Sequence, residues 1–221
     1  MPVLALAAAA LLGATLAPAR TATPPRPRPA AEPAVVRVRL VTSLGPITVA
    51  LDTRRAPVTA ANFLAYVDDG RLEGTSFYRA SRRRSNPRFG FIQGGIDTDH
   101  RRALTAIPIE PTTRTGIRHV DGAISMAHGT DPNSARGNFT LGVGPNPALD
   151  ARPGYPGYAA FGRVVAGMDT VRKILALPTG GGRDAMRGQM ILKPVLILKA
   201  ERLDGTPRPT GRVKPWLLFG R

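Results

Sequence analysis

Two polar side chains stand where strand-like apolar stretches end, and both are suited to chemistry. Arg79 lies in "TSFYRA", and Gln93 is followed by two glycines in "GFIQGG". A guanidinium is always charged, planar and rich in hydrogen-bond donors, so it can stabilise charge that develops in a bound ligand. The glycines allow the chain to turn away without blocking a groove. Taken alone, Arg79 is more typical of a solvated strand arginine, and an amide bonded to backbone is the alternative interpretation of Gln93.

Other reactive residue types are present, but their spacing fits no catalytic or metal-binding motif. Ser125 and His128 resemble a nucleophile and its base, yet the G-x-S-x-G turn that exposes such a serine is missing. The "DTDH" stretch (97–100) has no spacing typical of a metal site, and no histidine has a glutamate at zincin spacing. The loop "TGGGRDAMRG" lacks the lysine and Ser/Thr of a phosphate-binding loop. We therefore expect neither a metal nor a nucleotide cofactor.

The composition excludes thiol chemistry and indicates a basic surface. The chain has no cysteine, which rules out disulfides, thiolate nucleophiles and thiolate metal ligands. Its 31 lysines and arginines exceed its 15 acidic residues, giving a formal net charge of +16. Nucleic-acid sites usually interleave basic with aromatic residues, and aromatic residues make up only 5% of this chain. We expect no nucleic-acid partner, and we interpret the arginine-rich stretch at 81–88 as a solvated loop rather than a contact for an acidic partner.

The first residues have the pattern of an export signal. An apolar, alanine-rich run ends in Ala17, Pro18 and Ala19, which has the A-x-A shape of a secretory cleavage site. The run is short for a membrane span, and it has no lysine or arginine in front, so a disordered alanine-rich leader is the alternative. We predict a signal peptide at residues 1–19, a proline- and arginine-rich linker at 20–34, a periplasmic or secreted location, and no membrane span after cleavage.

The folded region is predicted to begin near residue 35 and to consist mainly of strands. In "VVRVRLVTS" the residues Val36, Val38 and Leu40 alternate with arginines, as in a half-exposed antiparallel strand. The stretch 56–70 has the apolar spacing of a helix, with Pro57 in its first turn and Gly70 at its end. Strands then recur between glycine-rich turns as "TSFYRA", "GFIQGG", "GAISMAH", "GNFTLGV", "YAAFGRVV" and "PVLILKAERL".

A second helix is expected at about 168–177, after Gly167 and close to the end of the strand series. This order predicts a closed or nearly closed antiparallel β-barrel of about eight strands, capped by two α-helices at its open ends. The barrel would occupy residues 35–204. The proline- and arginine-rich tail at 205–221 is expected to be loose, although Trp216 and the apolar residues after it could dock onto the barrel.

Six pieces of the sequence, in order, resemble the cyclophilin family of peptidyl-prolyl isomerases, particularly its bacterial secreted members. The stretch "LGPITVALDTRRAPVTAANFLAYVDDG" resembles the family's opening hairpin and first helix, and "SFYRA" resembles its F-H-R strand. "GFIQGG" is similar to G-F-x-x-Q-G-G, "GAISMAH" to G-x-L-S-M-A-N, "SARGNFTL" to S-x-x-S-Q-F-F-I, and "YAAFGRVVAGMDTVRKI" to V-F-G-x-V-x-x-G-M-x-V-V-x-x-I. The resemblance implies a cyclophilin-like barrel and isomerisation of X-Pro bonds.

The resemblance assigns Arg79 as the catalytic donor to the proline nitrogen and Gln93 as the residue that orients it and contacts substrate. Such a reaction needs no nucleophile, metal or general base, because the barrier of about 18–20 kcal/mol comes from amide resonance. The implied ligands are proline-containing peptides and unfolded client proteins, bound by a monomer. A module that binds proline peptides with little catalysis is the alternative reading.

The proline pocket departs from the family pattern. Counting back from Gln93 places Gly90 at the pocket phenylalanine, so either Phe91 replaces a pocket methionine or a slipped strand gives Phe89 the aromatic role. Thr140 replaces a floor phenylalanine and Ala148 an aromatic residue, so we expect an under-filled pocket. The full set expected to bind substrate is Gln93, Phe91, Phe89, Met126, Ala127, His128, Asn138, Thr140, Leu149 and Tyr158.

Overall fold

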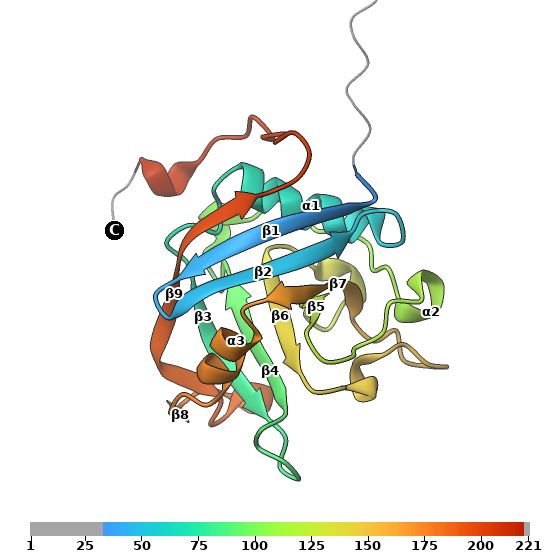
Figure 1. Cartoon of the computed structure of the whole chain (residues 1–221), viewed down its shortest axis with the longest axis vertical. Coiled ribbons are helices and arrows are strands. Elements are labelled where there is room, and N and C mark those ends of the chain that lie inside the picture. Colours follow the sequence, from blue (N-terminus) through green and yellow to red (C-terminus); the bar gives the residue numbers. More distant parts are fainter. Residues whose placement is uncertain (1–32, 219–221) are drawn as a thin grey trace, which may run out of the picture. The chain divides into compact units, whose positions relative to one another are not determined.

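The computed structural model describes residues 33–218. The predicted signal peptide and most of the predicted linker lie outside these residues. Figure 1 shows the strands wound into a barrel, with helices packed against it. The strands are β1 (Val35–Thr42), β2 (Gly45–Asp52), β3 (Ser76–Arg82), β4 (Gly90–Gly95), β5 (Ala123–Met126), β6 (Asn138–Val143), β7 (Ala159–Ala166), β8 (Thr179–Gly180) and β9 (Met190–Arg202).

Three α-helices and several single 3₁₀ turns connect the strands. The α-helices are α1 (Pro57–Asp68), α2 (Thr112–Thr115) and α3 (Met168–Leu175). The 3₁₀ turns are η1 (His100–Arg102), η2 (Pro132–Ser134), η3 (Pro147–Leu149), η4 (Asp184–Met186) and η5 (Pro215–Leu217). The two predicted helices are α1 and α3, and the four-residue α2 is too short to have produced an apolar periodicity.

Eight of the strands form a closed antiparallel barrel. The strand order is β1-β2-β7-β5-β6-β4-β3-β9, and β1 also pairs with β9, which closes the ring. The two-residue β8 adds to the outer edge of β9. Because the ring is closed, each of the eight strands is hydrogen-bonded to a neighbouring strand on both sides. The predicted barrel of about eight strands is therefore confirmed.

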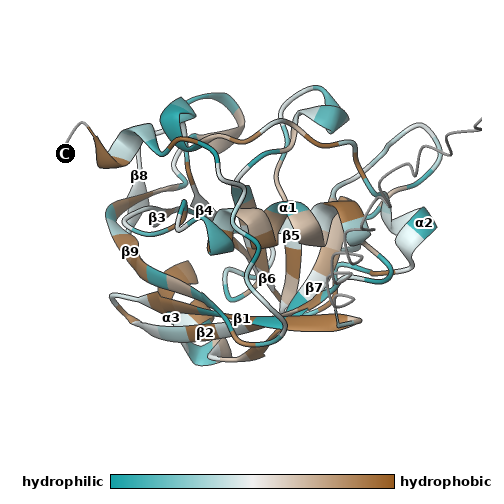
Figure 2. Ribbon diagram, turned by 90° about the horizontal axis from the view of Figure 1, so that it is seen from above, coloured by the Kyte–Doolittle hydropathy of each residue, from teal (hydrophilic) through white to brown (hydrophobic). Residues whose placement is uncertain are grey.

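The barrel interior holds the apolar residues that the sequence periodicity assigned to it. Val36, Val38 and Leu40 of β1 are fully buried, and Figure 2 shows apolar residues both on the strands and on α1. Phe63 of α1 contacts Phe139 of β6 edge to face, with 5.1 Å between ring centroids. The helix thus inserts an aromatic ring among the strands, which fixes its position against the barrel.

A buried polar chain, which we call the His119 relay, connects Ser125 of β5 to the loops that carry His119 and Asp150. The imidazole of His119 lies between the Ser125 hydroxyl, 2.9 Å from Nε2, and a carboxylate oxygen of Asp150, 2.7 Å from Nδ1. All three residues are buried. Burial lowers the pKa of His119 from its ordinary value, although the hydrogen bond to Asp150 opposes the shift. The neutral imidazole donates from Nδ1 to Asp150 and accepts from Ser125, so it satisfies both neighbours.

Residues 205–218, which we call the C-terminal strap, are fastened across the end of α1. Asp68 accepts from the Arg202 side chain at 2.6 Å and from the backbone N–H of Arg208 at 2.8 Å. Next to it, Asp69 accepts from the backbone N–H of Thr210 at 2.7 Å and from the buried Arg71. The expectation of a loose tail is therefore wrong for these residues.

Trp216 completes the attachment of the strap. Its ring lies against the guanidinium groups of Arg71 and Arg102, with 4.8 and 5.0 Å from the guanidinium carbons to the ring centroid. Arg71 is almost fully buried and also forms an ion pair with Asp69. The Trp216 ring thus covers a buried charge network, and cation–π contacts of this kind are stabilising.

We expect the His119 relay to make stability depend on pH. A folded-state pKa below the unfolded value of about 6.5 means that the unfolded chain binds the proton first. The free energy of unfolding should fall as pH decreases through about 6.5 towards the folded pKa, by up to about 1.4 kcal/mol per pH unit. Urea titrations at several pH values should show a steeper fall for the wild type than for His119→Gln. Equal slopes above pH 5 would contradict this assignment.

We expect Trp216→Ala to lower the free energy of unfolding by about 1–2 kcal/mol, since two partly shielded cation–π contacts are lost. Leu217→Ala is the matched control, because Leu217 is 69% exposed and should contribute little. Thermal unfolding followed by circular dichroism compares the two variants. A similar change in both melting temperatures would show that the ring does not hold the strap.

Candidate active site

A β-bulge in β3 brings two consecutive side chains to one residue of β4. Phe77 pairs with Gly94 and Arg79 with Gln93, so Tyr78 is the extra residue. Successive side chains of a regular strand point to opposite faces, and a bulge breaks this alternation. As a result Gln93 Oε1 accepts from Arg79 Nη1 and Gln93 Nε2 donates to the Tyr78 hydroxyl, both at 2.9 Å. The two bonds fix the orientation of the Gln93 amide.

A second irregularity, in β9, supplies another partner for the arginine. Arg79 pairs with Met190 whereas Phe77 pairs with Val195, so β9 bulges between these positions. Pro194, which has no N–H to donate, lies in this bulge. Just before β9, the Gln189 carbonyl accepts from the backbone of Ala80 at 2.9 Å, and Gln189 Oε1 accepts from Arg79 Nε at 2.9 Å. The sequence contained no signal for Gln189, which lies far along the chain in a glycine-rich loop.

The Arg79 guanidinium is hydrogen-bonded by neutral groups alone. Besides Gln93 and Gln189, its Nη2 donates to the Ala185 carbonyl at 3.3 Å. Arg79 forms no ion pair with a residue of the described range 33–218. Each of these bonds uses one N–H, so Nη1 and Nη2 each keep a second N–H for a ligand. Burial lowers the pKa of Arg79 from its ordinary value, yet a guanidinium stays charged at neutral pH.

An aromatic ring lies against the guanidinium, and it belongs to Phe91. The Phe91 ring centroid is 5.2 Å from the guanidinium carbon of Arg79. Gly90 cannot take the aromatic role, because a Cβ there would lie 2.0 Å from the Ser81 carbonyl oxygen. Phe89 packs its ring against Gly144 instead. It lines a cavity that includes neither Arg79 nor Gln93, so the inclusion of Phe89 in the substrate site is corrected.

Thr140 and Tyr158 lie beside this centre. Thr140 pairs with Gln93 on one side and with Ser125 on the other, in the centre of the sheet. Its position next to Gln93 is the one expected for a pocket floor. Tyr158 is close enough to Arg79 to affect its electrostatics, and its ring stacks on that of His128 at 4.4 Å between centroids.

Gln93 also lines a cavity of about 370 Å³, and Phe91 is not among the residues that line it. Ala127 and His128 line it, as predicted, and so does Met186 of the glycine-rich loop. Asn138 also lines it, but its amide exchanges two hydrogen bonds with the backbone of Asp97, at 2.7 and 2.9 Å. The Asn138 side chain therefore holds the adjacent turn, where Asp97 has a φ of +50°, instead of being free to bind a ligand.

The other two predicted site residues are Met126 and Leu149. Met126 is 1% exposed and belongs to the apolar core, because its strand position directs it into the barrel. Its inclusion among substrate-binding residues is corrected. Leu149 is half-buried, and the contact that relates it to the site is its carbonyl, which accepts from the N–H of Tyr158 at 3.0 Å.

The structure also explains the serine and histidine that resembled a hydrolase pair. Ser125 bonds to His119 and not to His128, and it is 2% exposed. Its hydroxyl cannot reach a substrate. His128 instead places both ring nitrogens against backbone carbonyls, those of Gly129 and Gly157, at 2.7 and 2.9 Å.

Within the described residues, no group of three or more potential ligands could hold a metal ion. The helices between residues 33 and 218 are all too short or too polar to cross a membrane.

Comparison with known proteins agrees with this geometry. The family model described as cyclophilin type peptidyl-prolyl cis-trans isomerase/CLD matches residues 37–202. A peptidyl-prolyl cis-trans isomerase of Streptomyces antibioticus is 36% identical over 169 residues, covering 75% of this chain and 98% of the relative. One of Acinetobacter baylyi is 37% identical over 142 residues, covering 64% and 73%.

Solved structures show the same fold. The crystal structure of a Cryptosporidium parvum cyclophilin type peptidyl-prolyl cis-trans isomerase is similar with a TM-score of 0.58 and 21% identity, covering 78% of this chain and 99% of that one. The same protein has been crystallised in the presence of the dipeptide Ala-Pro. The family match covers the barrel from Arg37 to Arg202 and includes the paired Arg79 and Gln93. This chain belongs to the cyclophilin-type peptidyl-prolyl cis-trans isomerase family.

Proposed function

We propose that the chain catalyses cis–trans isomerisation of X-Pro bonds in exported proteins and so assists their folding. The observation that carries the proposal is the Arg79 guanidinium, which is held by neutral acceptors and keeps unused N–H groups beside Phe91. A preorganised, uncompensated donor of this kind stabilises a lone pair that appears only when the amide twists.

The reaction requires no covalent step. In the planar amide the proline nitrogen shares its lone pair with the carbonyl, and the barrier of about 18–20 kcal/mol reflects the loss of that sharing. As the preceding carbonyl rotates, the lone pair localises on nitrogen and can accept from a free Nη N–H of Arg79. Gln93 and Gln189 hold the guanidinium still, and the Phe91 ring offers apolar surface for the proline ring. Arg79 therefore binds the twisted amide more strongly than the planar one.

A proline-peptide-binding module with little catalysis is the second candidate. Two observations favour it, namely that Gly90 has no room for a side chain and that Thr140 is small. A proline ring buries apolar surface worth roughly 2–3 kcal/mol in a close-fitting site, and this site offers fewer aromatic walls. Turnover measurements on a short X-Pro peptide distinguish the two candidates.

The export part of the proposal is supported by the sequence of residues 1–34. Their apolar run, A-x-A ending and proline-rich continuation have the order of a signal peptide and linker. The absence of cysteine throughout the chain is compatible with any redox environment. We further propose that the mature protein acts as a monomer on unfolded client chains.

Arg79→Ala should reduce kcat/KM for a short X-Pro peptide by about 10²–10³-fold, the loss expected for one preorganised charge-stabilising donor. Binding of the peptide should survive better than turnover, because the apolar walls are unchanged. A protease-coupled isomerisation assay measures the rate, and Arg84→Ala, an exposed arginine of the loop after β3, is the control. Wild-type turnover in Arg79→Ala would reject catalysis and leave the binding-module candidate.

Thr140→Phe should raise kcat/KM, because a phenyl ring beside Gln93 adds apolar contact with the proline ring. The increase should appear mainly as a lower KM. Circular dichroism must first show that the variant folds, because Thr140 lies in the centre of the sheet. Lower activity in a folded variant would mean that Phe91 already fills the space.

Export should yield a mature chain that begins near Arg20. Expression in a Gram-negative host followed by mass spectrometry of the periplasmic protein measures the N-terminus. An intact Met1 on protein recovered from the cytoplasm would contradict the export proposal without affecting the assignment of the active site.

A further inference from the structure

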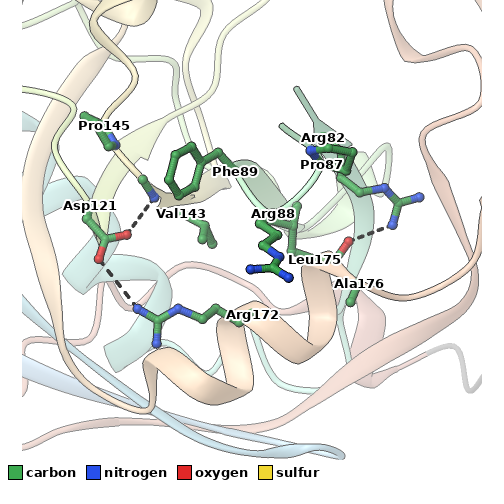
Figure 3. A pocket seen from close by; sticks show the side chains of 11 residues that line it. Arg82, Pro87, Arg88, Phe89, Asp121, Val143, Pro145, Arg172, Leu175 and Ala176 are labelled. Carbon is green, nitrogen blue, oxygen red and sulfur yellow. Dashed lines mark hydrogen bonds and ion pairs between the residues drawn. The ribbon is translucent and has the colours of Figure 1, made fainter. Parts of the chain in front are cut away.

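A second cavity, of about 730 Å³, lies between the C-terminal half of α3, the end of β6 and the loop that joins β3 to β4 (Figure 3). We call it the α3 groove. Its lining shares no residue with the cavity beside Gln93, so it is not part of the proline site. A volume of this size is within the range of small-molecule and peptide-binding pockets.

The floor of the α3 groove is apolar and preformed. Phe89, Val143 and Leu175 line it, and Phe89 is 37% exposed. The neighbouring Gly144 leaves space for the Phe89 ring, because a Cβ at Gly144 would lie 2.7 Å from it. Arg82, at the end of β3, connects this strand to α3, because its Nη1 donates to the Leu175 carbonyl at 2.8 Å.

The rim of the groove is positively charged. Arg88 is exposed, and its guanidinium has no hydrogen bond or ion pair with any residue of the described part of the chain. Figure 3 shows the Arg172 guanidinium extended towards Asp121, whereas no dashed line joins Arg88 to another lining residue. The one lining carboxylate, Asp121, accepts from the Gly144 N–H at 2.6 Å and pairs with Arg172 at 3.7 Å. Arg88 is therefore left without a counter-charge, and an anion would supply it.

We propose that the α3 groove binds an acidic peptide segment in which an apolar side chain stands next to carboxylates. The apolar side chain would contact Phe89 and Leu175, and a carboxylate would pair with Arg88. Arg172 already pairs with Asp169 at 3.1 Å and with Asp121, so it contributes less. Arginine binds carboxylates in a bidentate manner, and arginines next to exposed aromatic rings are typical anchors of peptide interfaces. The groove thus recognises client sequence independently of proline.

Charge excludes the occupants that this chain could itself provide. The N-terminal segment 20–34 contains three arginines against one glutamate, so it has the wrong sign for an arginine rim. A second copy carries a formal charge of +16, which opposes association through a cationic groove. Neither argument applies to an acidic segment of another protein.

The test uses a fluorescein-labelled peptide, Asp-Glu-Phe-Leu-Glu-Asp, which contains no proline, and fluorescence anisotropy with the full chain. We expect saturable binding that a short Ala-Pro substrate peptide does not displace. Arg88→Glu should weaken binding by about tenfold or more, as loss of a charge partner does at such interfaces. Arg84→Glu is the matched control, because Arg84 is an exposed arginine of the same loop that does not line the groove.

A second variant separates the apolar contribution from charge. Phe89→Ala should weaken binding of the peptide severalfold, whereas it should leave turnover of a short X-Pro peptide unchanged. Equal losses in Arg84→Glu and Arg88→Glu, or equal affinity for the peptide Asp-Glu-Ala-Ala-Glu-Asp, would show non-specific attraction and overturn the proposal. Arg88-dependent binding to phosphatidylglycerol vesicles without peptide binding would overturn it too, because the groove would then recognise lipid.

Discussion

The active centre depends on one constraint, which is that a half-buried guanidinium must be hydrogen-bonded without being neutralised. A carboxylate would satisfy Arg79 more strongly, but it would also occupy the N–H groups and cancel the charge that a twisted prolyl amide needs. Two glutamines and a backbone carbonyl solve the problem, since they accept hydrogen bonds and carry no net charge. The cost is that neutral acceptors must be placed accurately around the cation.

That placement explains why the strands are irregular where they meet Arg79. In a regular β3, Tyr78 would point to the opposite face from Arg79 and away from Gln93. In a regular β9, without the bulge, Gln189 would not be brought to the Arg79 guanidinium. Bulges recur next to active sites because they re-aim side chains at small cost to the rest of the sheet. Around this centre the barrel is held by an apolar core and by buried polar pairs such as Asp68–Arg202, in a chain that has no cysteine for disulfides.

Local periodicity was enough to predict the parts of the fold that obey it. The alternation in β1 identified its buried face, and the apolar spacing over 56–70 identified the helix α1. The order of the motifs predicted the barrel and the pairing of Arg79 with Gln93. Gln189 and the His119 relay could not be predicted, because they depend on contacts between segments far apart in sequence. Met126 was misassigned because a motif does not show which face of the strand a side chain occupies. Phe89 was misassigned because a motif does not show that β4 begins one residue later, at Gly90.

The pairing of β1 with β9 has a consequence for biosynthesis. The barrel closes between its first and last strands, so a nascent chain that has not yet released residues up to Arg202 leaves the edges of both β1 and β3 unpaired. Exposed strand edges invite aggregation. During synthesis the protein is therefore itself an unfolded chain in need of protection, and it can acquire its activity only after the whole barrel sequence is available.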